Sequence, residues 1–120
     1  MAWDVEHTDE FAGWFVTLEE VDQDSIDFPV DLLIEQGPNL SFPHSSAISG
    51  SRHSHMRELR VQSGGKPLRI FYAFDPRRSA ILLIGGDKTG DKRFYKQLLP
   101  VADALYDVHL DELRNKGLIE

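Results

Sequence analysis

The sequence contains no cysteine. Without thiols, neither a disulfide nor a thiolate metal site can stabilise the chain, and a cysteine nucleophile is excluded. A folded core is still available, because 41% of the 120 residues are hydrophobic. We therefore expect one domain, residues 1–120, that is stabilised by apolar burial alone.

Long apolar runs are also missing. No stretch approaches the roughly 18 apolar residues that a membrane helix needs. The N-terminal residues 1–6 are acidic and amphipathic, unlike the basic and then apolar pattern of a secretion signal. Together with the absence of cysteine, these features predict a soluble cytoplasmic protein that does not associate with a membrane.

Basic residues are absent from the first part of the chain. Residues 1–51 contain 11 Asp and Glu and no Lys or Arg, whereas residues 52–100 contain 11 Lys and Arg against 4 acids. The overall charge of −7 therefore conceals a basic central region. This uneven distribution predicts a basic binding surface, although basic residues that protect strand edges from aggregation would give the same pattern.

Three apolar runs in that basic region predict β-strands. They cover residues 56–63, 68–75 and 80–86, and each is rich in β-branched, aromatic or aliphatic residues. Gly64-Gly65-Lys66 and Pro76-Arg77-Arg78-Ser79 separate them as turns. Connections of about four residues allow only antiparallel neighbours, because a parallel return needs a crossover of roughly a dozen residues. The centre of the protein is therefore predicted to be an antiparallel meander.

The first part of the chain predicts a short edge strand and two helices. The alternation in residues 3–7 indicates a strand at one edge of the meander. Thr8 or Asp9 then caps a helix whose inward stripe is Phe11, Trp14, Phe15 and Leu18. Residues 22–25 interrupt the pattern, and Pro29 predicts that a second helix starts near Asp27 or bends. Gly37-Pro38 ends that helix.

The remaining segments complete the predicted fold. Residues 38–55 read as a long loop that carries three histidines. A C-terminal helix is expected from near Asp91, with a kink or a second helix at Pro100. The predicted class is α+β: a small antiparallel sheet packed against an N-terminal helical hairpin, with a C-terminal helix.

Arg69 is the most informative residue of the meander. Strand alternation places it on one face with Phe71 and Ala73, where a guanidinium is costly unless it is paired or faces a wet cleft. Glu58 and Arg60 share a face of the preceding strand. A structural Arg69–Glu58 ion pair and a ligand-facing Arg69 both remain open, and one does not exclude the other.

The residue types in this region suit phosphate chemistry without a metal. Arginine offers planar paired donors to phosphate oxygens, and histidine exchanges protons near neutral pH. In RNA the 2′-hydroxyl can attack the adjacent phosphorus, so an enzyme needs only a base, charge stabilisation and an acid. His53 and His55 are candidates for acid or base. They also have a spacing that suits a metal, but no third ligand is evident nearby.

The chain resembles the RelE/ParE toxin superfamily in four segments that follow one another at the family's spacing. They are Gly37-Pro38-Asn39-Leu40, Met56-Arg57-Glu58-Leu59-Arg60, Leu68-Arg69-Ile70-Phe71-Tyr72-Ala73-Phe74, and Gly86-Asp87-Lys88-Thr89 before a helix start rich in Lys, Arg and Tyr. The similarity covers nearly the whole chain. The HigB-like branch, which includes phage-derived addiction-module killer proteins, is the branch that it resembles most.

This resemblance implies a toxin of a type II toxin–antitoxin pair. Such a toxin cleaves mRNA on the ribosome without a metal or other cofactor, and a helix-turn-helix antitoxin controls it. Arg69 matches the family's phosphate-binding strand arginine, and Lys88 and Tyr95 match a basic residue and a tyrosine after the last strand. The expected catalytic residues are Arg60, Arg69, Lys88, Tyr95 and His55, and the expected RNA-binding residues are Arg52, His53, Arg57, Lys92, Arg93 and Lys96.

A non-enzymatic function remains as the alternative. The ParE-like branch inhibits DNA gyrase without cleaving RNA, and a degenerate toxin would only bind its antitoxin. Ribosome-dependent toxins tend to be basic, whereas this chain is acidic overall.

Overall fold

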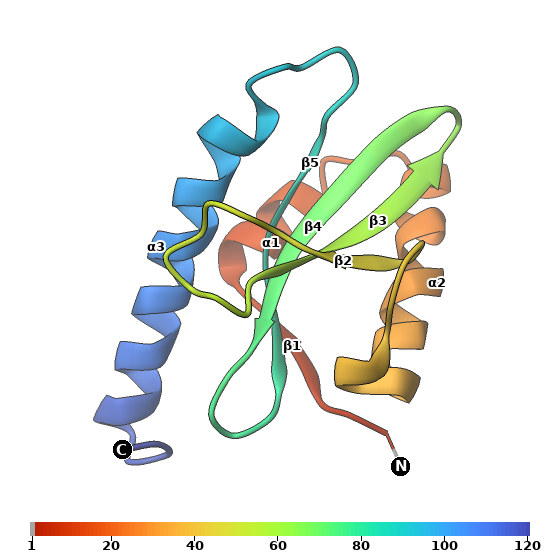
Figure 1. Cartoon of the computed structure of the whole chain (residues 1–120). Coiled ribbons are helices and arrows are strands. Elements are labelled where there is room, and N and C mark those ends of the chain that lie inside the picture. Colours follow the sequence, from red (N-terminus) through yellow and green to blue (C-terminus); the bar gives the residue numbers. More distant parts are fainter. Residues whose placement is uncertain (1) are drawn as a thin grey trace.

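The computed structural model describes residues 2–120 and contains one mixed five-stranded sheet with helices on both faces (Figure 1). The strand order is β1-β5-β4-β3-β2. The strands are β1 (Val5–His7), β2 (Ser45–Ala47), β3 (Arg57–Ser63), β4 (Lys66–Phe74) and β5 (Ala80–Asp87). Strands β3, β4 and β5 are antiparallel neighbours, which confirms the predicted meander.

The N-terminal strand β1 lies at one edge of the sheet, as predicted, and pairs with β5 in parallel. The parallel direction is possible because a long stretch of chain separates the two strands. At the other end of the meander, Gly64 and Gly65 form a two-residue turn with φ of 55° and 80°. Positive φ at both positions is what a type I′ hairpin turn requires.

The first two helices cover one face of the sheet. Helix α1 (Asp9–Phe15) begins after Thr8, whose side chain accepts a hydrogen bond of 2.9 Å from the Phe11 backbone N–H, as a helix cap does. Helix α2 spans Glu20–Gln36. The core on this side joins both helices to the strands, with buried residues that include Phe11, Ile26, Leu33, Leu59, Val61, Ile70, Tyr72 and Leu82.

The predicted start of the second helix near Asp27 is wrong. Helix α2 begins at Glu20 and continues through Pro29. Its buried residues include Asp22, so a carboxylate occupies a position where the apolar stripe should continue. Asp22 accepts hydrogen bonds from the Ser63 hydroxyl (2.6 Å) and the Lys66 ammonium group. The apolar pattern therefore did not reveal the first part of this helix, because the buried Asp22 interrupts it and the partners of Asp22 are distant in the sequence.

The third helix covers the opposite face of the sheet (Figure 1). Helix α3 spans Phe94–Asn115 as one element, so the second helix considered at Pro100 does not form. Pro100 has no backbone N–H, so the carbonyl of Lys96, four residues earlier, loses its helical hydrogen bond. Both residues are exposed, so water can bond to that carbonyl. The core on this side contains Met56, Phe71, Ala73, Ile81, Leu83, Phe94, Leu99, Ala102 and Tyr106. Among residues 2–120, no helix combines the length and apolar character that a bilayer crossing needs.

The segment predicted as a long loop, residues 38–55, contains more structure than expected. A short 3₁₀ helix, η1 (Gly37–Asn39), begins it, and strand β2 pairs antiparallel with β3. Strand β2 has only three residues without alternating apolar positions, which left no periodicity to detect. This strand extends the sheet beyond β3 and brings residues 42–46 beside the basic meander.

Candidate active site

The register of the meander brings two arginines together. Arg60 on β3 lies directly opposite Arg69 on β4, and Arg69 lies opposite Gly86 on β5. Directly opposed residues have their side chains on one face of a sheet. The first turn of α3 covers this face, and a Cβ added at position 86 would lie only 2.9 Å from the Phe94 ring. The glycine therefore lets the helix start lie close to the arginines.

Glu58 connects the polar groups of this face. Its Oε1 accepts a hydrogen bond of 2.7 Å from the Tyr95 hydroxyl and lies 3.8 Å from Arg69 Nε. Its Oε2 accepts a hydrogen bond of 2.8 Å from the Ser46 hydroxyl and lies 3.4 Å from Arg60 Nη1. The residue is only 4% exposed. A buried carboxylate is costly without partners; here the two arginines balance its charge and the two hydroxyls donate hydrogen bonds to it.

Arg69 is buried beneath this carboxylate and is 4% exposed. Its Nη1 donates a hydrogen bond of 3.0 Å to the Leu68 carbonyl, whereas its buried Nε has no hydrogen-bond partner among residues 2–120. The predicted ion pair with Glu58 is therefore present, but at 3.8 Å it is too long for a hydrogen bond. An unused buried guanidinium donor is expensive, so the arrangement favours an additional acceptor near this group.

Tyr95 and Lys88 form the side of the site that belongs to α3 and the loop before it. Burial and the Glu58 carboxylate raise the pKa of Tyr95 above its ordinary value, while Arg69 acts in the opposite direction. The hydroxyl therefore stays protonated at neutral pH. Lys88 Nζ lies 5.3 Å from the centre of the Tyr95 ring, within the range of a cation–π contact.

The charges of this cluster do not cancel. One carboxylate, Glu58, faces the guanidinium groups of Arg60 and Arg69, and Lys88 adds a further positive charge beside Tyr95. The surplus is positive, and the Arg60 side chain is 30% exposed and accessible from solvent. This cluster can attract an anion, hold it with arginine donors and exchange a proton through Glu58 and Tyr95. We call Glu58, Arg60, Arg69, Lys88 and Tyr95 the Glu58 cluster.

Arg57 does not belong to the Glu58 cluster. Alternation along β3 turns it to the opposite face, where its Nε donates a hydrogen bond of 3.0 Å to the Ser45 hydroxyl. The same hydroxyl shares a bond of 2.6 Å with Tyr72. Arg57 therefore lies on the side of α2, away from the Glu58 cluster, and its expected contact with RNA stays a prediction that this geometry does not support.

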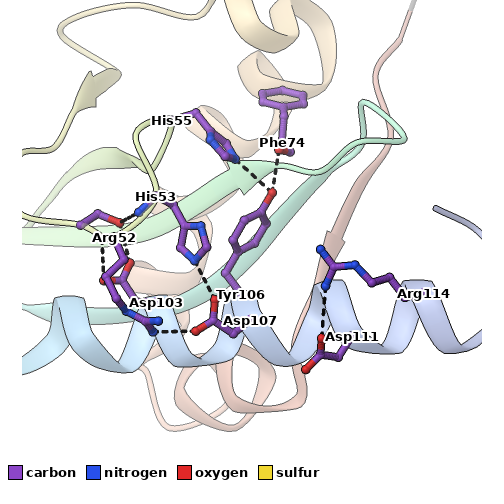
Figure 2. A network of polar contacts seen from close by, with 10 residues as sticks. Arg52, His53, His55, Phe74, Asp103, Tyr106, Asp107, Asp111 and Arg114 are labelled. Atoms are coloured by element: carbon purple, nitrogen blue, oxygen red, sulfur yellow. Dashed lines mark hydrogen bonds and ion pairs between the residues drawn. The ribbon is translucent and has the colours of Figure 1, made fainter. Parts of the chain in front are cut away.

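The expected residues Arg52, His53 and His55 lie in a separate network on the middle of α3 (Figure 2). His55 Nε2 shares a hydrogen bond of 3.0 Å with the Tyr106 hydroxyl, and Arg52 and His53 both contact Asp107. Tyr106 is 11 positions beyond Tyr95 on the same helix, which corresponds to about 16 Å along its axis. These three residues therefore lie apart from the Glu58 cluster, and this geometry does not support the expected catalytic role of His55.

The other expected RNA-binding residues surround the start of α3. Lys92 and Arg93 precede the helix, Lys96 lies in its first turn, and all three are exposed. They flank Tyr95 in sequence and leave their charged ends to solvent.

Sequence reasoning missed the central position of Glu58 and the contributions of Ser46 and Phe42. Strand alternation placed Glu58 and Arg60 on one face, which indicated an ion pair between them. It did not indicate that Glu58 has four polar partners. Phe42 contacts the Arg60 guanidinium at 5.1 Å, and nothing in the loop sequence indicated this. In the part of the chain that the structure describes, no group of three or more His, Asp and Glu side chains is arranged to hold a metal ion.

Comparison with known proteins supports one family. Residues 13–107 match the model of "Phage derived protein Gp49-like (DUF891)". HigB3 of Mycobacterium tuberculosis, which is named as a toxin, is 43% identical over 91 residues, covering 75% of this chain and 78% of that protein. HigB2 of the same organism, also named as a toxin, is 33% identical over 109 residues, which cover 89% of this chain but only 54% of HigB2.

The fold also matches a solved toxin structure. An arginine-to-alanine double mutant of the E. coli toxin RelE in the free state superposes with a TM-score of 0.56, covering 78% of this chain and 92% of that chain. At 9% identity this likeness concerns the fold alone. The family match and the HigB similarity confirm the HigB-like resemblance noted in the sequence: the chain belongs to the phage-derived Gp49-like family and is HigB-like.

Proposed function

We propose that this protein is the toxin of a type II toxin–antitoxin pair and that it inhibits translation by cleaving mRNA on the ribosome. The observation that carries the proposal is the buried Glu58 carboxylate, which is hydrogen-bonded to Tyr95 at 2.7 Å and flanked by Arg60 and Arg69. A base, a proton donor and two guanidinium groups in one place are what metal-independent RNA cleavage needs.

The cleavage would proceed by transfer to the neighbouring hydroxyl. Glu58 accepts the proton of the 2′-hydroxyl, whose oxygen forms a bond to the adjacent phosphorus as the bond to the 5′-oxygen breaks. Tyr95 donates its proton to that leaving oxygen and recovers one from Glu58 through their hydrogen bond. The products are a 2′,3′-cyclic phosphate and a free 5′-hydroxyl. Arg69 and Arg60 stabilise the charge that develops on the phosphate oxygens.

The exposed basic residues around α3 would position the RNA. Lys88, Lys92, Arg93 and Lys96 lie near Tyr95 in sequence, and the last three are exposed. They would contact the phosphates of mRNA or ribosomal RNA, and such contacts weaken as the salt concentration rises. The protein would act in the cytoplasm under the control of a helix-turn-helix antitoxin.

A poison of DNA gyrase or a pure antitoxin-binding protein is the alternative function. Neither needs a carboxylate hydrogen-bonded to a tyrosine between two arginines. The Glu58 cluster therefore favours the nuclease.

The test compares two arginines on opposite faces of the same sheet. Arg69→Ala should abolish growth inhibition after induction, whereas Arg57→Ala should leave it nearly unchanged. Circular dichroism would establish that both variants fold, and Arg69→Lys would separate charge from the paired guanidinium donors. Mapping of transcript 5′ ends should give new ends for the wild type and for Arg57→Ala only. Persistent toxicity of folded Arg69→Ala, or DNA damage with intact transcripts, would refute the nuclease.

A further inference from the structure

Two phenylalanines are exposed near Arg60, the most accessible arginine of the Glu58 cluster. Phe42 is 69% exposed and Phe28 is 59% exposed, so neither ring contributes much to the core. Phe42 precedes β2 and Phe28 lies on α2, so they approach the β3 edge from two different elements. Exposed rings on two elements at one place are unusual for a surface that binds nothing.

A cavity of about 270 Å³ opens between these elements. Its lining includes Phe28, Pro43, His44 and Arg60. The rings of Phe28 and His44 meet edge to face with their centres 5.6 Å apart. The cavity is close to the lower end of the range for small-molecule sites, roughly 300–1,000 Å³, and suits a flat group such as a single base.

Arg60 joins this cavity to the Glu58 cluster. The same side chain lines the cavity, lies 3.4 Å from Glu58 Oε2 and places its Cζ 5.1 Å from the centre of the Phe42 ring. A phosphate held at Arg60 would therefore have its attached base within reach of Phe42 and the cavity. An exposed ring beside an arginine is the arrangement with which proteins bind unpaired bases.

We propose that Phe42 and the cavity form a base-binding subsite for single-stranded RNA. An unpaired base stacks on the Phe42 ring and reaches the cavity beside Phe28, while Arg60 contacts its phosphate. The subsite rests on the proposed cleavage of RNA and adds a source of sequence preference. Purines bind more tightly than pyrimidines there, because a larger ring offers more stacking surface.

The test measures binding without cleavage. Short 2′-O-methyl RNA oligonucleotides of adenine and of uracil serve as probes, because their blocked hydroxyl cannot attack phosphorus. Fluorescence anisotropy should show tighter binding of the adenine probe. Phe42→Leu, which keeps an apolar side chain without a ring, should weaken adenine binding by about 10-fold. Phe42→Tyr should retain it, and Val108→Ala, at an exposed apolar position on α3, should change nothing.

Several results would overturn the subsite. One is that Phe42→Leu binds the adenine probe as tightly as the wild type does. Another is that Phe42→Tyr loses as much affinity for that probe as Phe42→Leu does. A third is that the wild type binds neither probe measurably. Loss of a protein partner by Phe42→Leu with unchanged RNA binding would assign the rings to a protein interface instead.

The subsite and the nuclease can fail separately. If new transcript ends are absent for the wild type but ring-dependent adenine binding persists, the cleavage proposal fails and the subsite stands. If Phe42→Leu still cleaves transcripts at unaltered positions and binds the probes normally, only the subsite fails.

Discussion

The Tyr95 hydroxyl donates a hydrogen bond of 2.7 Å to Oε1 of Glu58 and so links the first turn of α3 to β3. The two residues are 37 positions apart and belong to elements on different layers. Through Glu58, the Tyr95 hydroxyl is connected to the guanidinium groups of Arg60 and Arg69.

Replacement of Glu58 by glutamine should remove the general base. The amide keeps the shape of the side chain but cannot accept a proton, so cleavage of mRNA should fall by about 100- to 10,000-fold. It also leaves the buried Arg69 without its counter-charge, and the free energy of unfolding should fall by about 3 kcal/mol. Urea denaturation and transcript-end mapping measure the two effects. Ser46→Ala, which touches the same carboxylate through a neutral group, is the control and should lose far less of both.

Tyr95→Phe should retain the ring and lose the proton donor. The Lys88 contact with the ring remains, whereas the hydrogen bond to Glu58 is lost, at a cost of about 1 kcal/mol in stability. Cleavage should fall by about 100-fold. In the wild type, ultraviolet titration should show two tyrosines, Tyr95 and Tyr106, that ionise above the ordinary pKa of 10.0, and the variant should lack the Tyr95 component. A variant with full activity would exclude the hydroxyl from catalysis.

The Asp22 carboxylate should stabilise the fold at neutral pH. Its hydrogen bonds from Lys66 and Ser63 hold its pKa below the ordinary value of 3.8. Because the folded pKa is the lower one, this stabilisation is present above pH 3.8 and is lost as the pH falls through the folded pKa. Asp22→Asn should lower the urea midpoint at pH 7, and the difference from wild type should shrink in acid. A pH-independent difference would point to packing instead of charge.

His55 should titrate below its ordinary pKa of 6.5. Burial lowers the pKa of this side chain, and the neighbouring His53 lowers it further. Because the unfolded chain binds the proton more readily, His55 makes folding less favourable as the pH falls below about 6.5. An NMR titration of the imidazole resonances measures its pKa. His53→Gln should shift it upward, and an unchanged value in that variant would leave burial as the sole cause.

Gly85 should resist substitution because α1 packs directly on it. A Cβ there would meet the Trp14 ring at 2.3 Å, so Gly85→Ala should destabilise the fold by about 1–3 kcal/mol. Gly13 on α1 is the matched control. Apart from its chain neighbours and the nearby backbone of its own helix, no heavy atom of residues 2–120 lies within 4 Å of its added Cβ, and Gly13→Ala should stabilise the helix by about 0.5–1 kcal/mol. Thermal unfolding of the two variants should therefore shift in opposite directions.

Local patterns in the sequence determined the central sheet and the first helix. Residues 56–86 alternate or run apolar between glycine and proline turns, and short connections leave only the antiparallel arrangement. Thr8 precedes an apolar stripe and becomes a helix cap. In each case the controlling interactions join residues that are close in the sequence, so periodicity and turn chemistry are sufficient. The family resemblance supplied Arg69 and Tyr95 as site residues.

Only the tertiary structure decided which charged groups meet. Asp22 lies in α2 because Ser63 and Lys66, some 40 positions later, satisfy it. His55 is near Arg57 in sequence, yet its hydrogen bond to Tyr106 places it far from Tyr95. Alternation assigns a residue to a face, but the element that covers that face comes from the packing of the whole chain. Burial and long-range charge pairing, which no local pattern encodes, therefore selected the members of the Glu58 cluster.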